Sequence, residues 1–281
     1  MLKLNILAAI QCLIFLNDKF IIYSTYDKKN YIADISAQNT SALKNNVYIN
    51  SAVLSNDKTK IVAALDNGEV FIYDAQSLDK KTVANANLNK KIISIAPSDN
   101  NDEYYILMHT GELVKWNSAN NNTKEVFSRS RHIASSLTAI PDKNLLVVCY
   151  ADGTIFYFDT KNDQVGYEFS GGKSKVESAV YDPKTQLLAL IGSDKRITLL
   201  DTKDFASQPF YIEENNLRSS RVNSVRFNQK GILFALTDKN QILYWDSDIN
   251  QYAKSLETLN LQPLTANEKS LVLGREFAGG W

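Results

Sequence analysis

Two residues, His109 and His132, are the only histidines among the 281 residues of the chain. A metal site needs several His, Cys or carboxylate side chains that converge on one point. The carboxylates that do cluster stand in two short polar stretches, residues 99–103 and 213–214, beside asparagines. Clusters of this kind are typical of solvated loops. We therefore expect no metal site and no cofactor.

The sequence also lacks the short motifs that accompany nucleophilic or phosphoryl chemistry. It has no G-x-S-x-G nucleophile turn, no phosphate-binding P-loop and no H-E-x-x-H metal motif. One glycine-rich stretch, residues 171–173, stands alone and is interpreted as a flexible connector. No catalytic residue is predicted, and the chain is predicted not to be an enzyme.

Basic side chains recur immediately before segments that alternate between apolar and polar residues. The guanidinium of arginine is a planar fork that binds carboxylate or phosphate groups through two parallel hydrogen bonds. The pattern predicts a docking surface for a protein partner, either acidic or phosphorylated. The alternative is ordinary solvated surface charge. The candidate partner-binding residues are Lys91, Arg129, Arg131, Lys175, Arg218 and Arg221.

The elements that must position these residues are clearest in the segment from Val222 to Asp246. Three apolar runs, at residues 222–227, 232–237 and 242–246, are separated by turns rich in Asn, Asp, Lys and Gly. Short apolar or β-branched runs bounded by such turns predict consecutive β-strands. The last of the three ends on Trp245-Asp246.

The same pattern occurs five more times upstream, and each copy closes on an apolar residue followed by Asp or Asn. The five intervals from Asp34 to Asp246 average about 42 residues, within the ~40–45 residues of a four-stranded propeller blade. The sequence therefore predicts an all-β fold, a β-propeller of four-stranded antiparallel blades with six visible repeats. The alternative is seven blades, with residues 1–8 as the last strand of a partial seventh blade that is either completed by the C-terminal tail or lost upstream. The earlier closing pairs are Ala33-Asp34, Tyr73-Asp74, Trp116-Asn117, Phe158-Asp159 and Leu200-Asp201.

Equivalent loops of a propeller lie on one face of the ring, so the basic residues are expected to gather at one end of the channel. The turns between second and third strands lie on the same face and carry acidic residues. That face is therefore expected to have mixed charge. The acidic residues of these turns are Asp27, Asp66, Asp152, Asp194 and Asp238.

The closing pairs and the Asp-Gly turns resemble those of the WD-repeat family. The residues that carry the resemblance are Trp245-Asp246, its variants at Tyr73-Asp74, Trp116-Asn117 and Phe158-Asp159, and the turns at residues 152–153 and 66–68. The Gly-His dipeptide of that family is absent, so its His-Ser-Asp-Trp hydrogen-bond network is not expected. The resemblance implies a propeller that binds proteins.

The propeller is predicted to span residues 1–262, and residues 263–281 form a C-terminal tail. Thr265 and Glu268 are spaced as a capping box after Pro263, which predicts a helix start. The tail also resembles the L-T-x-x-E segment that follows WD-repeat arrays in bacterial signalling ATPases and caspase-like proteases. That resemblance implies that the chain is the sensor part of such a protein.

Charge and composition restrict the partners. Lys plus Arg and Asp plus Glu both number 31, so no global attraction to nucleic acid or to an anionic membrane exists. No run approaches the ~18 apolar residues of a membrane span. The two cysteines, Cys12 and Cys149, lie in apolar runs and are interpreted as free thiols in a reducing compartment, which predicts a cytoplasmic protein.

The N-terminus leaves one alternative open. Lys3 followed by the apolar residues 6–16 resembles a secretory signal, and cleavage after residue 16 would make the protein exported. Residues 10–34, however, can be laid over the repeat at 222–246, which favours a strand.

The function predicted from the sequence is a non-enzymatic scaffold for protein–protein interaction or ligand sensing. The alternative is a propeller enzyme that acts on a small molecule or sugar at the mouth of the channel. Several acidic or His side chains at that mouth would favour the enzyme.

Overall fold

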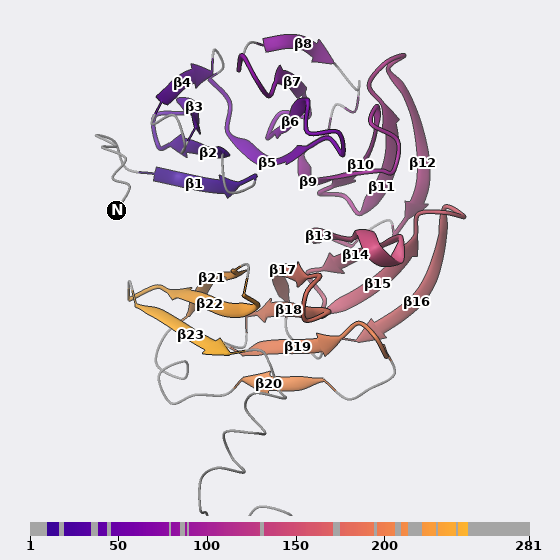
Figure 1. Cartoon of the computed structure of the whole chain (residues 1–281). Helices are drawn as coiled ribbons and strands as arrows, with labels where there is room; N and C mark the ends of the chain where they lie inside the picture. The colour runs from indigo at the N-terminus through magenta and orange to yellow at the C-terminus, as the bar shows by residue number, and fades with distance from the viewer. Residues whose placement is uncertain are drawn as a thin grey trace, which may run out of the picture.

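The computed structural model contains 23 β-strands in six antiparallel sheets, arranged around a central axis (Figure 1). This confirms the predicted propeller fold. Among the described residues, no helix is long and apolar enough to cross a membrane. The structure describes residues 10–16, 20–34, 39–43, 46–78, 80–84, 88, 90–129, 132–170, 175–193, 196–205, 209–212, 221–228, 230–239 and 241–246.

The first three sheets each have four strands, paired in the order of the chain. Sheet one contains β1 (Ile10–Phe15), β2 (Phe20–Thr25), β3 (Asn30–Asp34) and β4 (Asn39–Leu43). Sheet two contains β5 (Ile49–Leu54), β6 (Lys60–Leu65), β7 (Val70–Asp74) and β8 (Lys80–Ala84). Sheet three contains β9 (Ile92–Pro97), β10 (Glu103–Met108), β11 (Glu112–Asn117) and β12 (Asn122–Ser128).

The remaining sheets follow the same plan, and the sixth has three described strands. Sheet four contains β13 (Ala134–Ile140), β14 (Leu145–Tyr150), β15 (Thr154–Asp159) and β16 (Gln164–Ser170), with the 3-10 turn η1 (Pro141–Lys143) between its first two strands. Sheet five contains β17 (Val176–Asp182), β18 (Leu187–Gly192), β19 (Ile197–Asp201) and β20 (Phe210–Ile212). Sheet six contains β21 (Val222–Phe227), β22 (Ile232–Thr237) and β23 (Ile242–Asp246).

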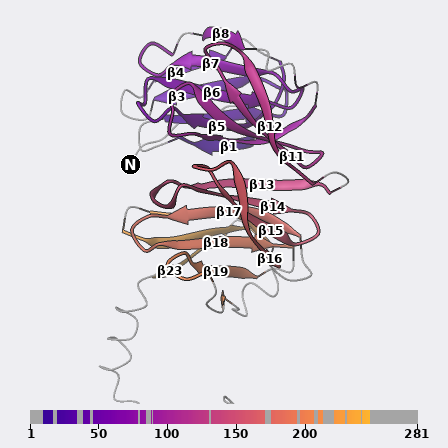
Figure 2. The same ribbon diagram turned by 90° about the vertical axis from the view of Figure 1, so that its right-hand side faces the viewer.

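The first strand of each sheet lies nearest the axis, and in sheets one to five the fourth strand lies at the rim (Figures 1 and 2). The core consists of apolar layers between consecutive sheets. In sheets one to five the second strand is buried on both faces: in β6, Ile61 packs towards sheet one while Val62 packs towards sheet three. This explains why the second strands are apolar throughout rather than alternating.

All six first strands contain an irregularity in their pairing with the second strand. In β17, Val176 pairs with Gly192 and Ser178 with Ile191, so one residue is skipped. Such a bulge places the residues at positions i and i+3 on the same buried side, here Val176 and Ala179. The first strands therefore present a buried apolar pair to the preceding sheet.

In sheets two to five the closing Asp or Asn has a structural role at the end of the third strand. The carboxylate of Asp74 accepts hydrogen bonds from the backbone N–H groups of Gln76 and Ser77, at 2.8 and 2.9 Å. Asn117 and Asp159 make the same turn in sheets three and four. Short carboxylate and amide side chains recur at this position because they satisfy the backbone of the following turn.

Two sequence predictions lie wholly or partly outside the described residues. Within the N-terminal apolar stretch, the described residues 10–15 form strand β1, as the repeat predicts. The tail at 263–281, with its predicted helix start, lies outside the described residues, and that boundary stays a prediction.

Candidate docking face

The links that lead into the first strands and the turns between second and third strands lie on one side of the ring, which we call the connector face. The residue after a second strand donates its backbone N–H to the carbonyl just before the first strand of the same sheet. His109 donates to Lys91, Ser193 to Lys175 and Asp238 to Arg221, each at 2.9 Å. Three of the predicted basic residues therefore occupy the same position in three different sheets.

Glycines allow the links to approach the turns closely. Gly68 has a φ of +88°, and a Cβ atom added there would lie 2.6 Å from the carbonyl oxygen of Lys90. Gly111 has a φ of +97°, and its Cβ would lie 2.6 Å from the oxygen of Arg129 and 2.7 Å from that of His132. Only glycine tolerates both the dihedral angle and the contact. These turns therefore fix where the basic links lie.

Lys91 is paired with the turn of the preceding sheet. Its Nζ lies 2.6 Å from the carboxylate of Asp66, which also accepts a hydrogen bond of 3.0 Å from the side chain of Asn50. These bonds from Asn50 and Lys91 hold the pKa of Asp66 below its usual range. The ammonium of Lys91 remains half-exposed at 48%. The neighbouring Lys90 makes a second pair with Glu112, at 2.6 Å.

Arg129 is the most enclosed of the basic candidates that the structure describes. Its guanidinium lies over the rings of Tyr150 and Phe156 and 3.3 Å from the carboxylate of Asp152. The imidazole of His132 lies 3.0 Å from the same carboxylate. Partial burial raises the pKa of Asp152, but hydrogen bonds from Thr154 and the charge of Arg129 outweigh it and lower the pKa overall.

Arg221 and Lys175 complete the described set. The guanidinium of Arg221 donates to Glu177 of sheet five at 2.5 Å, which raises the pKa of Arg221, and its backbone N–H donates to Asp238 at 3.0 Å. Lys175 is exposed, and its ammonium has no ion-pair partner among the described residues. Two of the predicted candidates, Arg131 and Arg218, lie outside the described residues.

The described part of the connector face thus carries both charges, as the sequence predicts. The pairs Lys91–Asp66 and Arg221–Glu177 each join the link into one sheet with the preceding sheet, whereas Arg129–Asp152 joins the link into sheet four with a turn of the same sheet. Ion pairs between partly exposed groups contribute little to stability. In the structure they orient the basic side chains, which stay partly exposed.

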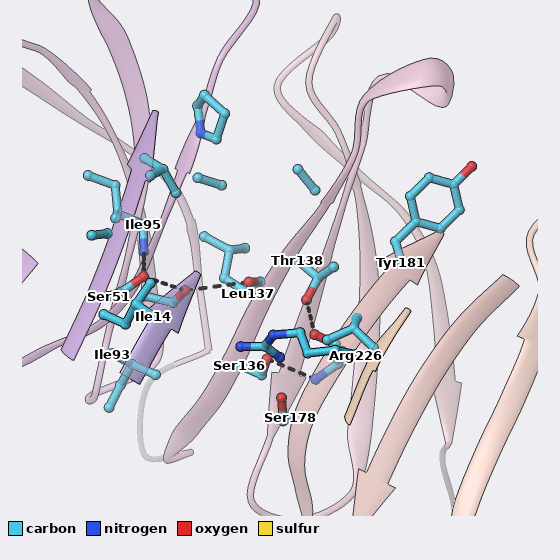
Figure 3. A pocket seen from close by; sticks show the side chains of 18 of the residues that line it. Ile14, Ser51, Ile93, Ile95, Ser136, Leu137, Thr138, Ser178, Tyr181 and Arg226 are labelled. Atoms are coloured by element: carbon cyan, nitrogen blue, oxygen red, sulfur yellow. Dashed lines mark hydrogen bonds between the residues drawn. The ribbon is translucent and has the colours of Figure 1, made fainter. Parts of the chain in front are cut away.

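The channel forms a cavity of about 680 Å³ between the first strands (Figure 3). Hydroxyl groups on its wall bond across consecutive sheets. The Oγ of Ser136 accepts a hydrogen bond of 3.3 Å from the backbone of Ala179, and Thr138 donates to the carbonyl of Ala179 at 2.8 Å. Ser51 accepts the equivalent bond from Ile95, at 3.2 Å. Two acidic residues line the cavity, Glu177 and Asp182. Glu177 accepts a hydrogen bond from Arg221, and Asp182 accepts hydrogen bonds from Thr185.

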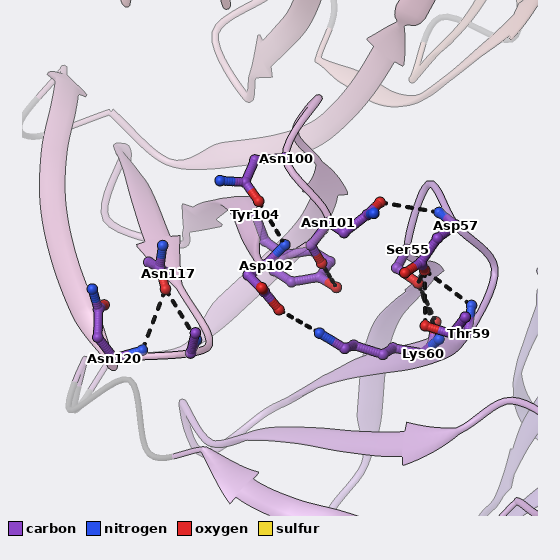
Figure 4. Close-up of polar contacts among 11 residues, drawn as sticks. Ser55, Asp57, Thr59, Lys60, Asn100, Asn101, Asp102, Tyr104, Asn117 and Asn120 are labelled. Atoms are coloured by element: carbon purple, nitrogen blue, oxygen red, sulfur yellow. Dashed lines mark hydrogen bonds and ion pairs between the residues drawn. The ribbon is translucent and has the colours of Figure 1, made fainter.

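The opposite side of the ring carries the acidic stretch at residues 99–103 (Figure 4). There Asp102 forms an ion pair with Lys60, and the side chain of Asn101 accepts a hydrogen bond of 3.1 Å from the backbone of Asp57. These contacts join the turns of sheets two and three, which is a structural role. In the part of the chain that the structure describes, no group of three His, Cys, Asp or Glu side chains could hold a metal ion.

The sequence interpretation missed the acidic partner Glu177 and the hydroxyl contacts of the channel. A signal for the second was present, because a serine recurs at one register of five first strands. These residues are Ser51, Ser94, Ser136, Ser178 and Ser224. The stacking of Arg129 on Tyr150 and Phe156 could not be predicted from such a pattern, since the two aromatic residues come from two different strands.

The fold defines the chain as a β-propeller. The family model of the NUP159/214 β-propeller matches residues 17–195, which is more than half of the chain, and the chain belongs to this family. Among solved structures, it is similar to the β-propeller domain of Cps50 (Swd1) from Myceliophteria thermophila, with a TM-score of 0.71 and 12% identity over 85% of this chain and 83% of that one. At this identity the similarity concerns the fold alone. No curated protein matches the chain.

Proposed function

We propose that this propeller is a non-enzymatic scaffold that binds a protein partner on its connector face through acidic or phosphorylated groups of the partner. The observation that carries the proposal is the array of basic side chains at successive sheet entries, all on one face: Lys91, Arg129, Lys175 and Arg221. Loops held by a rigid scaffold are where binding is usually built.

Electrostatics favours a partner with concentrated negative charge. On this face Asp66, Asp152 and Glu177 already hold basic groups, so a single carboxylate of a partner gains little by replacing one of them. A phosphate offers about two charges and three acceptor oxygens and can engage two basic groups together. Zero net charge gives no attraction to nucleic acid at large, so the interaction is local.

The proposal also includes a cellular location and a signalling role. The buried thiol of Cys149, whose pKa is raised by burial to about 12, supports a cytoplasmic location, where free thiols persist. The L-T-x-x-E resemblance in the tail supports a sensing role in a bacterial signalling protein. The cytoplasmic location and the sensing role are therefore both part of the proposal.

The test is capture from cell extract at low salt with two variants of matched charge. One changes Arg129, Arg131, Arg218 and Arg221 to Ala. The control changes four lysines of the opposite side of the ring to Ala, namely Lys143, Lys184, Lys203 and Lys230. We expect the same partner with wild type and control, and its loss from the connector-face variant at an unchanged melting temperature. Equal capture by both variants would contradict the proposal.

A further inference from the structure

Sheet six exposes large apolar side chains on the face that points away from sheet five. Leu236 of β22 is 41% exposed, and Ile242 and Tyr244 of β23 are 68% and 71% exposed. Their neighbours Leu233 and Ala235 point the other way and are buried against sheet five. One face of β22 and β23, which we call the sixth-sheet face, is therefore apolar and uncovered by the described residues. Clusters of exposed apolar side chains of this kind mark interfaces.

The residues at the equivalent positions of four other sheets are buried, which shows that this face normally packs against a neighbour. Leu236 pairs with Ile242 in the same register as Ala64 with Val70, Leu107 with Leu113, Cys149 with Ile155 and Ile191 with Ile197. All eight of these equivalent residues are at most 1% exposed. This face is buried in four sheets and exposed in the sixth. In sheet six it therefore lacks a segment that packs on it among the described residues.

In the interfaces between sheets that the structure describes, the same kind of segment always packs on this face. The face of each sheet is packed by the i and i+3 apolar pair of the next first strand in the chain. Ile191 and Ile197, for example, pack with Val222 and Val225, and Cys149 and Ile155 with Val176 and Ala179. The cover is always the segment that follows the sheet.

The spacing along the chain identifies the residues that would do this for sheet six. The first residue of the covering pair follows the closing Asp or Asn by 15 residues in the shortest case, Asp34 to Ile49, and by 21 in the longest, Asp201 to Val222. Counted from Asp246, this window is residues 261–267. It contains one pair of large apolar residues that starts within it and is spaced i and i+3, Leu261 with Leu264.

We propose that the sixth-sheet face binds the segment that follows it, residues 247–281, with Leu261 and Leu264 packed on Leu236 and Ile242. The segment is joined directly to β23, so its effective concentration at the face is on the order of millimolar. A partner protein or a second copy must compete with this tethered segment. The face is thus an internal docking surface, separate from the connector face.

A double-mutant cycle in the whole chain tests the proposal through the thermal midpoint. Ile242→Ser and Leu264→Ser should each lower the midpoint by roughly 5 °C or more, because each removes a buried apolar contact. The double variant should melt close to the worse single variant, because both changes break the same contact. Phe210→Ser is the matched control, since Phe210 is 52% exposed on β20 and lies outside this face. Its midpoint should stay near wild type.

Three results would overturn the proposal. If Ile242→Ser behaves like Phe210→Ser, nothing covers the face. If the two serine changes are additive, the tail packs elsewhere, and sheet one or a partner covers the face. If the wild-type midpoint rises over a hundredfold increase in protein concentration, a second copy is the cover. Should Ile242→Ser fail to fold, Ile242→Ala and Leu264→Ala supply the same cycle with smaller shifts.

Discussion

At Gly111, the absence of a side chain lets the turn between β10 and β11 lie close to the link that leads into sheet four. The backbone there has a φ of +97°, and the carbonyl oxygens of Arg129 and His132 occupy the space that a Cβ would need. These two residues carry basic groups of the connector face. The position of those groups therefore depends on a glycine that never contacts a partner.

Gly111→Ala is expected to destabilise the fold by about 2 kcal/mol or more, because the variant combines backbone strain with a contact that cannot relax cheaply. Gly166→Ala is the control, since its Cβ would lie 3.5 Å from the oxygen of Tyr157, an ordinary contact within strand β16. That change should be neutral or stabilise by up to ~1 kcal/mol. Urea unfolding of both variants measures the difference. Equal stabilities would show that the turn can relax.

At the scale of elements, the strands were predictable and their connections were less so. The period of about 42 residues and the apolar second strands predict the sheets, because a strand buried on both faces needs a continuous apolar run. The bulges of the first strands were not predicted. Their signal is the i and i+3 spacing of apolar residues such as Val176 and Ala179, which departs from the alternation of a regular strand, and its meaning is clear only once the preceding sheet that the pair packs against is in place.

In the candidate site, too, the positions of the residues could be predicted from the sequence while their contacts could not. The repeated position of Lys91, Lys175 and Arg221 followed from the period alone. Their pairing with particular acids did not, because it depends on the distance between neighbouring sheets, as with Arg221 and Glu177. Whether these residues bind a partner stays a prediction.

Hydrogen bonds between first strands connect one element to the next. Thr138→Val keeps the shape of the side chain but removes its hydrogen bond to the carbonyl of Ala179, 2.8 Å long. We expect a loss of about 1 kcal/mol in the free energy of unfolding. Thr123→Val, on the exposed outer strand β12, should change it by less than ~0.5 kcal/mol. If both variants unfold alike in urea, the channel hydroxyls contribute no connection between sheets.

At the scale of the whole molecule, the ring separates stability from binding. The apolar layers between sheets supply the fold, while the charged groups stand on partly exposed links. Belonging to the NUP159/214 β-propeller family is consistent with this division, since it fixes the scaffold and leaves the loops free to vary. We propose that the connector face recognises concentrated negative charge.

The most direct test is a titration of the whole chain with a labelled synthetic peptide that carries several phosphoserines. We expect binding at low salt that weakens steeply as salt increases, because the contacts are ionic. The variant with Arg129, Arg131, Arg218 and Arg221 changed to Ala should bind at least tenfold more weakly than the variant with four lysines changed on the opposite side. Equal affinities of the two variants would contradict the account and move the docking surface away from the connector face.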